Sequence, residues 1–211
     1  GKNNNVVALN RFTRKIIWKS KALGQETSFC SPMLIKLPLL NMFVALSRHS
    51  IFALNALNGE LLWSQKLENF KYEGEHCNTP IFSDGFLYYT TADENGNGTV
   101  KLEISADGKS IKEIWRNKGY GNAYGGFIKA NDELFLCTND KKMVCIDAKN
   151  GNVINALKLV KGGLIFAQNR FYCYNETGEM KLISNQNNLL TEISKFKITK
   201  GSKEHFSHPA I

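Results

Sequence analysis

Short apolar runs separated by turn-forming pairs recur along the whole chain. Runs such as PMLIKL, MFVALS, SIFALN, FLYYTT and ELFLCT are rich in β-branched, aromatic and other apolar residues, a composition that favours strands. Gly and Asn tolerate the positive φ that tight hairpin turns demand. The turn-forming pairs are Asp84-Gly85, Asp107-Gly108, Asn131-Asp132, Asn139-Asp140, Asn150-Gly151 and Gln168-Asn169. No window keeps helical apolar spacing for three turns, so the sequence predicts an all-β fold.

The turn chemistry repeats at a nearly regular interval. Each unit opens with a small or turn-forming pair before an apolar strand, and the steps between successive pairs are 48, 46, 37 and 46 residues. The pairs are Ser31-Pro32, Thr79-Pro80, Gly125-Gly126, Gly162-Gly163 and His208-Pro209. Four strands fit into each step, and four-stranded antiparallel units at this spacing are typical of β-propeller blades.

The repeat therefore predicts a single β-propeller domain over residues 1–211, with about four to five blades that form part of a larger propeller. The predicted units are a half-blade at 6–20, blades at 28–66, 77–117, 123–158 and 162–199, and the start of a further blade at 205–211.

A second repeated feature is a tryptophan at the end of the unit. Ala8-Leu9-Asn10 followed by Trp18 precedes Ala53-Leu54-Asn55 followed by Trp63 by 45 residues, and a third copy has Asn155 at the tryptophan position. A large flat side chain fills the wedge between twisted sheets. We therefore predict structural packing between blades for Trp18, Trp63 and Trp115.

Composition and charge narrow the function classes. The 211 residues carry a net charge of +8, from 27 Lys and Arg against 19 Asp and Glu. The basic residues are scattered rather than clustered, which argues against nucleic-acid binding and favours a solvated basic surface. No stretch of 18 apolar residues occurs, so we expect no transmembrane segment. The sequence begins at Gly1 rather than Met, and we expect an upstream segment to have been removed.

The five cysteines are odd in number and include no C-x-x-C motif and no adjacent pair. Four of them lie in or beside apolar strand patterns. This distribution favours free, buried thiols that pack as small apolar side chains over a disulfide scaffold.

The repeat carries a resemblance to a known group of proteins. The pattern Ala-Leu-Asn, three residues, Gly, three residues, Trp is complete at Ala53–Trp63, has Arg14 in place of Gly in the first copy, and is partial at Val144–Asn155. It resembles the repeat of the quinoprotein-like propellers, a superfamily that includes the pyrroloquinoline-quinone (PQQ) dependent alcohol dehydrogenases and the lipoprotein of the outer-membrane β-barrel assembly machinery. The resemblance covers Val6 to Ile211.

The resemblance implies a propeller in the cell envelope, periplasmic or otherwise exported, and two classes of function. A quinoprotein dehydrogenase needs PQQ, a Ca²⁺ ion held by oxygen ligands, a carboxylate base and, in the family, a disulfide between adjacent cysteines. This sequence has no adjacent cysteines and no acidic cluster at the blade starts. We therefore predict a non-enzymatic binding or scaffold module without a cofactor. The alternative is a PQQ-dependent alcohol dehydrogenase-like oxidoreductase with PQQ and Ca²⁺.

Polar residues precede the first strand of each predicted blade, and these segments gather around one mouth of the central channel. We predict a binding site there for a protein or a small ligand. Its candidate residues are His76, Asn78, Tyr124, Lys161, His205 and His208. His76, His205 and His208 with Cys77 could also hold a metal, but we favour the interpretation in which such residues hydrogen-bond strand ends, and predict no metal.

The two ends of the sequence are predicted to form incomplete blades. It starts with the third and fourth strands of a blade and finishes with the first strand of another. Two arrangements would close the open edges. Pro209–Ile211 could lie beside the hairpin at Val6–Trp18 and complete a five-bladed ring, or two copies could pair through their open blade edges. Symmetric pairing is common, and the homodimer is the favoured prediction.

Overall fold

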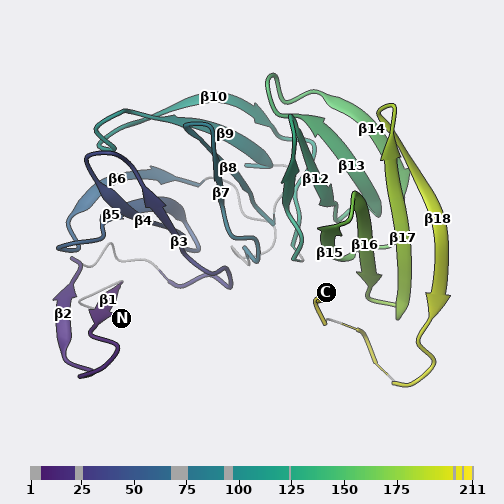
Figure 1. Ribbon diagram of the computed structural model, residues 1–211, viewed down its shortest axis with the longest axis horizontal. Coiled ribbons are helices and arrows are strands. Elements are labelled where there is room, and N and C mark those ends of the chain that lie inside the picture. The colour runs from purple at the N-terminus through teal and green to yellow at the C-terminus, as the bar shows by residue number, and fades with distance from the viewer. Residues whose placement is uncertain are drawn as a thin grey trace.

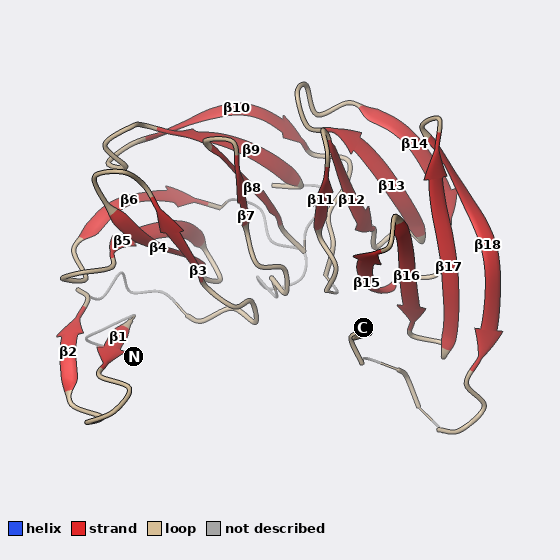
Figure 2. Cartoon of the chain, viewed as in Figure 1, coloured by secondary structure: helices blue, strands red, loops and turns tan. Residues whose placement is uncertain are grey.

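The computed structural model describes residues 6–21, 26–67, 76–92, 97–123, 125–201, 203–205 and 207–210. Within these ranges the chain forms strands and turns, without a helix (Figure 2). It follows that, in the part described, no helix is long and apolar enough to cross a membrane.

The strands form one two-stranded hairpin and four four-stranded sheets, which we call blades 1 to 4 in chain order. The hairpin consists of β1 (Val7–Leu9) and β2 (Ile16–Lys19). Blade 1 consists of β3 (Met33–Lys36), β4 (Asn41–Leu46), β5 (Ser50–Asn55) and β6 (Leu61–Lys66). Blade 2 consists of β7 (Ile81–Ser83), β8 (Phe86–Thr90), β9 (Thr99–Ile104) and β10 (Ile111–Asn117). Blade 3 consists of β11 (Ile128–Ala130), β12 (Glu133–Cys137), β13 (Lys142–Asp147) and β14 (Val153–Lys158). Blade 4 consists of β15 (Gly162–Ala167), β16 (Arg170–Asn175), β17 (Glu179–Gln186) and β18 (Leu189–Lys197).

Every blade is an antiparallel meander in which each strand pairs with the next one along the chain. The first strands β3, β7, β11 and β15 lie on the inner side of the arc, and the last strands β6, β10, β14 and β18 lie on its rim (Figure 1). Tight turns make this possible: Asp84 and Gly85, and Gln168 and Asn169, have positive φ, as the hairpin turns predicted from sequence require. The predicted all-β propeller architecture of four-stranded blades is confirmed.

The described chain forms an open arc, with the β1–β2 hairpin at one end and blade 4 at the other (Figure 1). β1 pairs with β2 alone, and residues 207–210 carry no strand. The five-bladed ring with a composite blade is therefore not formed by the described residues. Pairing of two copies through the open edges stays a prediction, which a single chain does not test.

The core consists of apolar layers between neighbouring blades. One cluster joins blades 1 and 2 and includes Val44, Ile51 and Leu102, and further clusters join blades 2 and 3 and blades 3 and 4. Both faces of the middle strands are buried, as in β5, where Ser50 through Leu54 are all buried. Each blade therefore depends on its neighbours for stability, as in other repeat proteins.

Two tryptophans dock on the next blade along the chain, where a glycine leaves room for the ring. Trp18 of β2 donates its indole N–H to the Ala56 carbonyl of blade 1 at 3.1 Å. A Cβ atom on Gly59, which has φ +76°, would lie 2.4 Å from the Trp18 ring. The repeated glycine thus serves the tryptophan of the preceding unit as well as its own turn.

Trp115 of β10 docks in the same way across blades 2 and 3. Its indole N–H donates to the Ala148 carbonyl at 3.2 Å, and a Cβ atom on Gly151 would lie 2.7 Å from its ring. At the corresponding position of blade 3, Asn155 accepts a hydrogen bond from the Leu190 amide of blade 4 at 3.3 Å. A small amide therefore bridges the blades where the tryptophan is missing.

Trp63 of β6 differs from the other two. It is only 7% exposed and belongs to the cluster between blades 1 and 2, yet its indole nitrogen has no hydrogen-bond partner among the described residues. The corresponding turn of blade 2, Ser105 to Ser110, has the same length as those of blades 1 and 3, but its glycine lies one position earlier. This Gly108 packs against Leu40 and Met42 instead. Trp63 is held by apolar contacts.

Candidate binding site at the inner strands

A pocket lies where the inner strands of blades 3 and 4 meet the segment that enters blade 2. Its volume is 610 Å³. It is lined by Cys77, Asn78, Thr79, Gly125, Gly126, Phe127, Ile128, Lys129, Leu164, Ile165, Phe166 and His208. We call it the inner-strand pocket. Asn78 and His208, two of the residues predicted from sequence, therefore contribute to one cavity.

The glycine pair before β11 explains how blades 3 and 4 come close at the pocket. Gly126 has φ +107°, and a Cβ atom there would lie 2.4 Å from the backbone nitrogen of Leu164 in β15. A Cβ atom on Gly125 would lie 2.9 Å from the His208 ring. Only glycine permits this approach of backbone to backbone and leaves space for the imidazole.

Polar contacts fix the segment that enters blade 2. The side-chain amide of Asn78 donates a hydrogen bond to the backbone carbonyl of Asn122 at 3.1 Å. The backbone N–H of Asn122 in turn donates to the backbone carbonyl of Thr91 at 2.9 Å. Asn78 thus ties the start of blade 2 to the start of blade 3. At the other side of the pocket, the Lys129 ammonium donates to the Asn131 carbonyl at 2.6 Å and lies 3.6 Å from the Asp84 carboxylate.

His76 lies behind the wall of this pocket rather than in it. The side chain is 1% exposed. Its Nδ1 accepts a hydrogen bond from the Ala92 amide at 3.3 Å, and its Nε2 lies 3.3 Å from the Arg48 carbonyl. With Nδ1 as an acceptor, Nε2 carries the proton and donates to Arg48. The imidazole joins loops of blades 1 and 2, as in the interpretation favoured above, in which such residues hydrogen-bond strand ends.

Lys161 lies in the connection from blade 3 to blade 4, where its ammonium is 3.4 Å from the Glu176 carboxylate. Tyr124 falls outside the described residues. His205 lies apart from the inner-strand pocket and accepts or donates a hydrogen bond at Nδ1 with the Tyr174 hydroxyl at 2.5 Å. Of the five candidate residues that the structure describes, only Asn78 and His208 line the inner-strand pocket.

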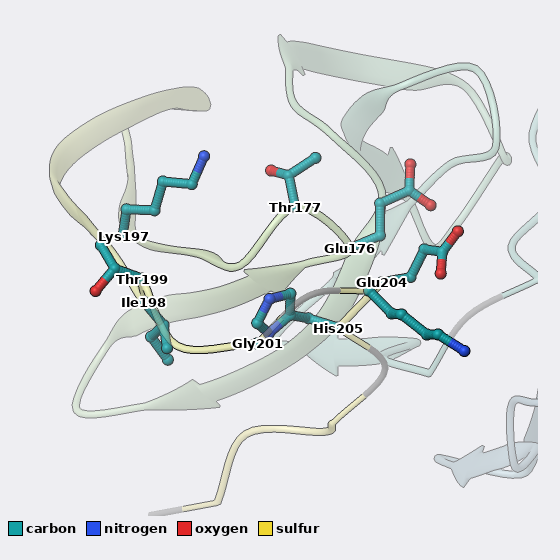
Figure 3. A pocket seen from close by; sticks show the side chains of 9 residues that line it. Glu176, Thr177, Lys197, Ile198, Thr199, Gly201, Glu204 and His205 are labelled. Carbon is teal, nitrogen blue, oxygen red and sulfur yellow. The ribbon is translucent and has the colours of Figure 1, made fainter.

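His205 lies in a second pocket, between the β16–β17 turn of blade 4 and the segment that leaves β18 (Figure 3). This pocket has a volume of 680 Å³ and is lined by Glu176, Thr177, Lys197, Ile198, Thr199, Gly201, Lys203, Glu204 and His205. Its charged side chains are of both signs, and the ring of His205 packs edge-on against Tyr174. The segment that leaves β18 forms most of this pocket. Its mixture of acidic, basic and apolar side chains does not favour one class of ligand.

A comparison with models of protein families assigns the chain to a family. The family model described as "Outer membrane protein assembly factor BamB" matches residues 1–157, more than half of the chain. The chain belongs to the BamB family. The resemblance to the quinoprotein-like propellers inferred from the repeat is thereby confirmed.

Two relatives of this BamB family member are similar over most of the chain. The uncharacterized protein RC0314 of Rickettsia conorii is 24% identical over 158 residues, which are 72% of this chain and 36% of the relative. The crystal structure of BamB from Moraxella catarrhalis matches with a TM-score of 0.68 at 13% identity, over 91% of this chain and 58% of that chain. This likeness shows the fold. The chain spans about a third and about three fifths of the two relatives, respectively.

The inner-strand pocket of this BamB family member lacks the ligands that the cofactors of the quinoprotein dehydrogenases require. The lining of the inner-strand pocket contains neither Asp nor Glu, so it offers no carboxylate for Ca²⁺ or for a general base. Across the described ranges, no three His, Cys, Asp or Glu side chains are grouped to hold a metal ion. His76, His205 and His208, with Cys77, do not meet at one point.

Sequence reasoning missed the apolar and cationic part of the pocket. Phe127, Ile128, Lys129 and the Leu164–Phe166 segment line it, but in the sequence they appear as ordinary strand residues. The available signal was the Gly125-Gly126 pair, which was recognised as a blade start. A glycine pair at that point implies a close approach of another backbone, and hence a surface shared by two blades.

Proposed function

We propose that this chain is a non-enzymatic binding module that serves the assembly of outer-membrane proteins in the cell envelope, on the periplasmic side or otherwise exported. The family match over residues 1–157 carries the proposal. The partner is a protein, bound at the inner-strand pocket as an extended segment. The description of the family names outer-membrane protein assembly, and the lining of the pocket suggests how a partner would be recognised.

The pocket suits an extended protein segment. β11 and β15 are the first strands of their blades, and among the described residues each pairs along one edge only. Such open edges bind added strands through backbone hydrogen bonds. Apolar side chains of a segment could contact Phe166, which is 38% exposed, and Ile128 beside it.

Photo-cross-linking tests this proposal. With p-benzoylphenylalanine in place of Phe166, irradiation of cells that produce the protein is expected to yield an adduct with a protein of the outer-membrane assembly pathway. The control places the same group at Leu57, which is 83% exposed on the β5–β6 turn of blade 1, outside the inner-strand pocket. No adduct at Phe166, or the same adducts at both positions, would count against binding at the pocket.

A second prediction concerns the rival function. We expect no stable complex with PQQ and Ca²⁺ and no dye-linked oxidation of alcohols, because the chain has no adjacent cysteines and the pocket has no carboxylate. Purified protein mixed with equimolar PQQ and excess Ca²⁺, then desalted, should carry no quinone absorption. Stoichiometric retention of the quinone, with oxidation activity that a chelator removes, would establish the dehydrogenase instead.

A further inference from the structure

Two buried cysteines face each other across the boundary between blades 3 and 4. Cys137 ends β12 and Cys173 lies in β16, 36 residues apart in the chain, and their Sγ atoms are 3.6 Å apart. The side chains are 1% and 0% exposed, within the apolar cluster that joins the two blades. A disulfide bond measures about 2.05 Å, so a relative shift of about 1.5 Å would join them.

We propose that Cys137 and Cys173 form a disulfide that links blades 3 and 4 when the chain encounters a low-molecular-weight or protein disulfide. One thiolate attacks a sulfur of that oxidant, and the oxidant's S–S bond breaks to release one thiolate. The second cysteine then attacks the mixed disulfide, which forms the Sγ–Sγ bond and releases the other thiolate. The two cysteines lose two electrons and two protons, and the oxidant's disulfide becomes two thiols.

The environment of the two thiols determines at which stage of folding the disulfide forms. The hydrogen bond to Cys173, followed by burial, raises the pKa of the Cys137 thiol well above its ordinary value. Because the thiolate is the attacking species, the closed native protein reacts slowly. The bond therefore forms while the chain folds, before blade 4 has fully packed on blade 3 and while both sulfurs are accessible to the oxidant.

The position of the pair gives the bond a role in the proposed site. The inner-strand pocket is built from Gly126–Lys129 of blade 3 and Leu164–Phe166 of blade 4, and Leu164 belongs to the same cluster as the two cysteines. A covalent link between the blades fixes the width of this pocket. That the bond forms in cells depends on the proposed envelope location, because disulfides persist in oxidising compartments. Its formation in vitro does not.

Oxidative refolding of the full chain tests the inference. Protein unfolded and reduced in denaturant is diluted into a buffer of oxidised and reduced glutathione, or into the same buffer with excess dithiothreitol. Peptide mapping without reduction is expected to find Cys137 linked to Cys173, and the oxidised protein should melt about 5–10 °C higher than the reduced protein, in line with a loop of this length. Cys145 of β13 lies in the same cluster, and the matched control Cys145→Ser should keep this increment.

The comparison within each variant removes the effect of the substitution itself. Cys137→Ser and Cys173→Ser should each have one melting temperature in both buffers, whatever their stability relative to the natural chain. An increment that persists in either variant, or a map in which both cysteines stay free, overturns the assignment. If the bond forms in vitro but thiol trapping finds both cysteines reduced in cells, the chemistry stands and the proposed envelope location fails.

Discussion

Trp63→Ala is expected to lower the free energy of unfolding by about 3–5 kcal/mol, the range found when large core side chains are truncated. Trp63 is 7% exposed and packs in the cluster that joins blades 1 and 2, with Val44 and Leu102 among its members. Its loss opens a cavity at an interface on which both blades depend. Urea unfolding followed by circular dichroism measures the change, with the slope m as a check that the same surface unfolds.

Trp63→Phe is the matched control. The indole nitrogen has no hydrogen-bond partner among the described residues, so phenylalanine gives up volume without breaking a described hydrogen bond. We expect a loss of about 1–2 kcal/mol. Equal losses for the two variants would mean that the indole nitrogen has a polar role. A loss below about 1 kcal/mol for Trp63→Ala would mean that the side chain does not fill the wedge between the blades.

The tryptophan repeat also shows how far sequence reasoning reaches. The spacing of the strands and the turn chemistry were sufficient to predict the propeller, because period-2 apolar runs and positive-φ turn residues are local signals. For the repeated glycine, the sequence predicts only one of its two roles. The turn chemistry predicts positive φ at Gly151, and Gly59 has it as well, but both glycines also make room for the rings of Trp115 and Trp18. Local patterns do not contain this contact between units.

The binding site was less accessible to prediction for the same reason. Asn78 and His208 line the inner-strand pocket, but His76, two positions before Asn78, is turned into the wall by contacts with Ala92 and Arg48. Which side of the backbone a connecting residue faces depends on how two blades meet, not on the spacing of the repeat. His205 is likewise drawn away from the pocket by its hydrogen bond to Tyr174.

The repeat alone does not predict whether the blades form an open arc or a closed ring. Antiparallel meanders with this period are compatible with an open or a closed arrangement, because each blade contacts only its neighbours. Exposed apolar residues mark the two ends of the arc, with Ile16 and Ile17 at 53% and 60% exposure in β2, and Ile193 and Phe196 at 49% and 61% in β18. The central blade boundaries, by contrast, are sealed by buried clusters.

Gly126→Ala is expected to cost about 2–5 kcal/mol of unfolding free energy, even though it adds one methyl group. Alanine at φ +107° carries a backbone penalty of about 1–2 kcal/mol. The new Cβ atom would also lie 2.4 Å from the Leu164 nitrogen and 2.7 Å from the Leu164 oxygen. These are backbone atoms that no rotamer change can move, so blade 4 must shift away from blade 3, and overpacking of this kind costs about 1–3 kcal/mol more.

Gly85→Ala separates the two contributions. Gly85 has φ +82° in the β7–β8 turn, and a Cβ atom there would meet nothing within 4 Å, so this variant should lose only the backbone penalty of about 1–2 kcal/mol. The difference between the two urea midpoints, at a common slope m, measures the close approach of blades 3 and 4. If the two glycine variants lose the same stability, the boundary beside the inner-strand pocket yields to the added methyl group, and the pocket is not held at a fixed width by its backbone.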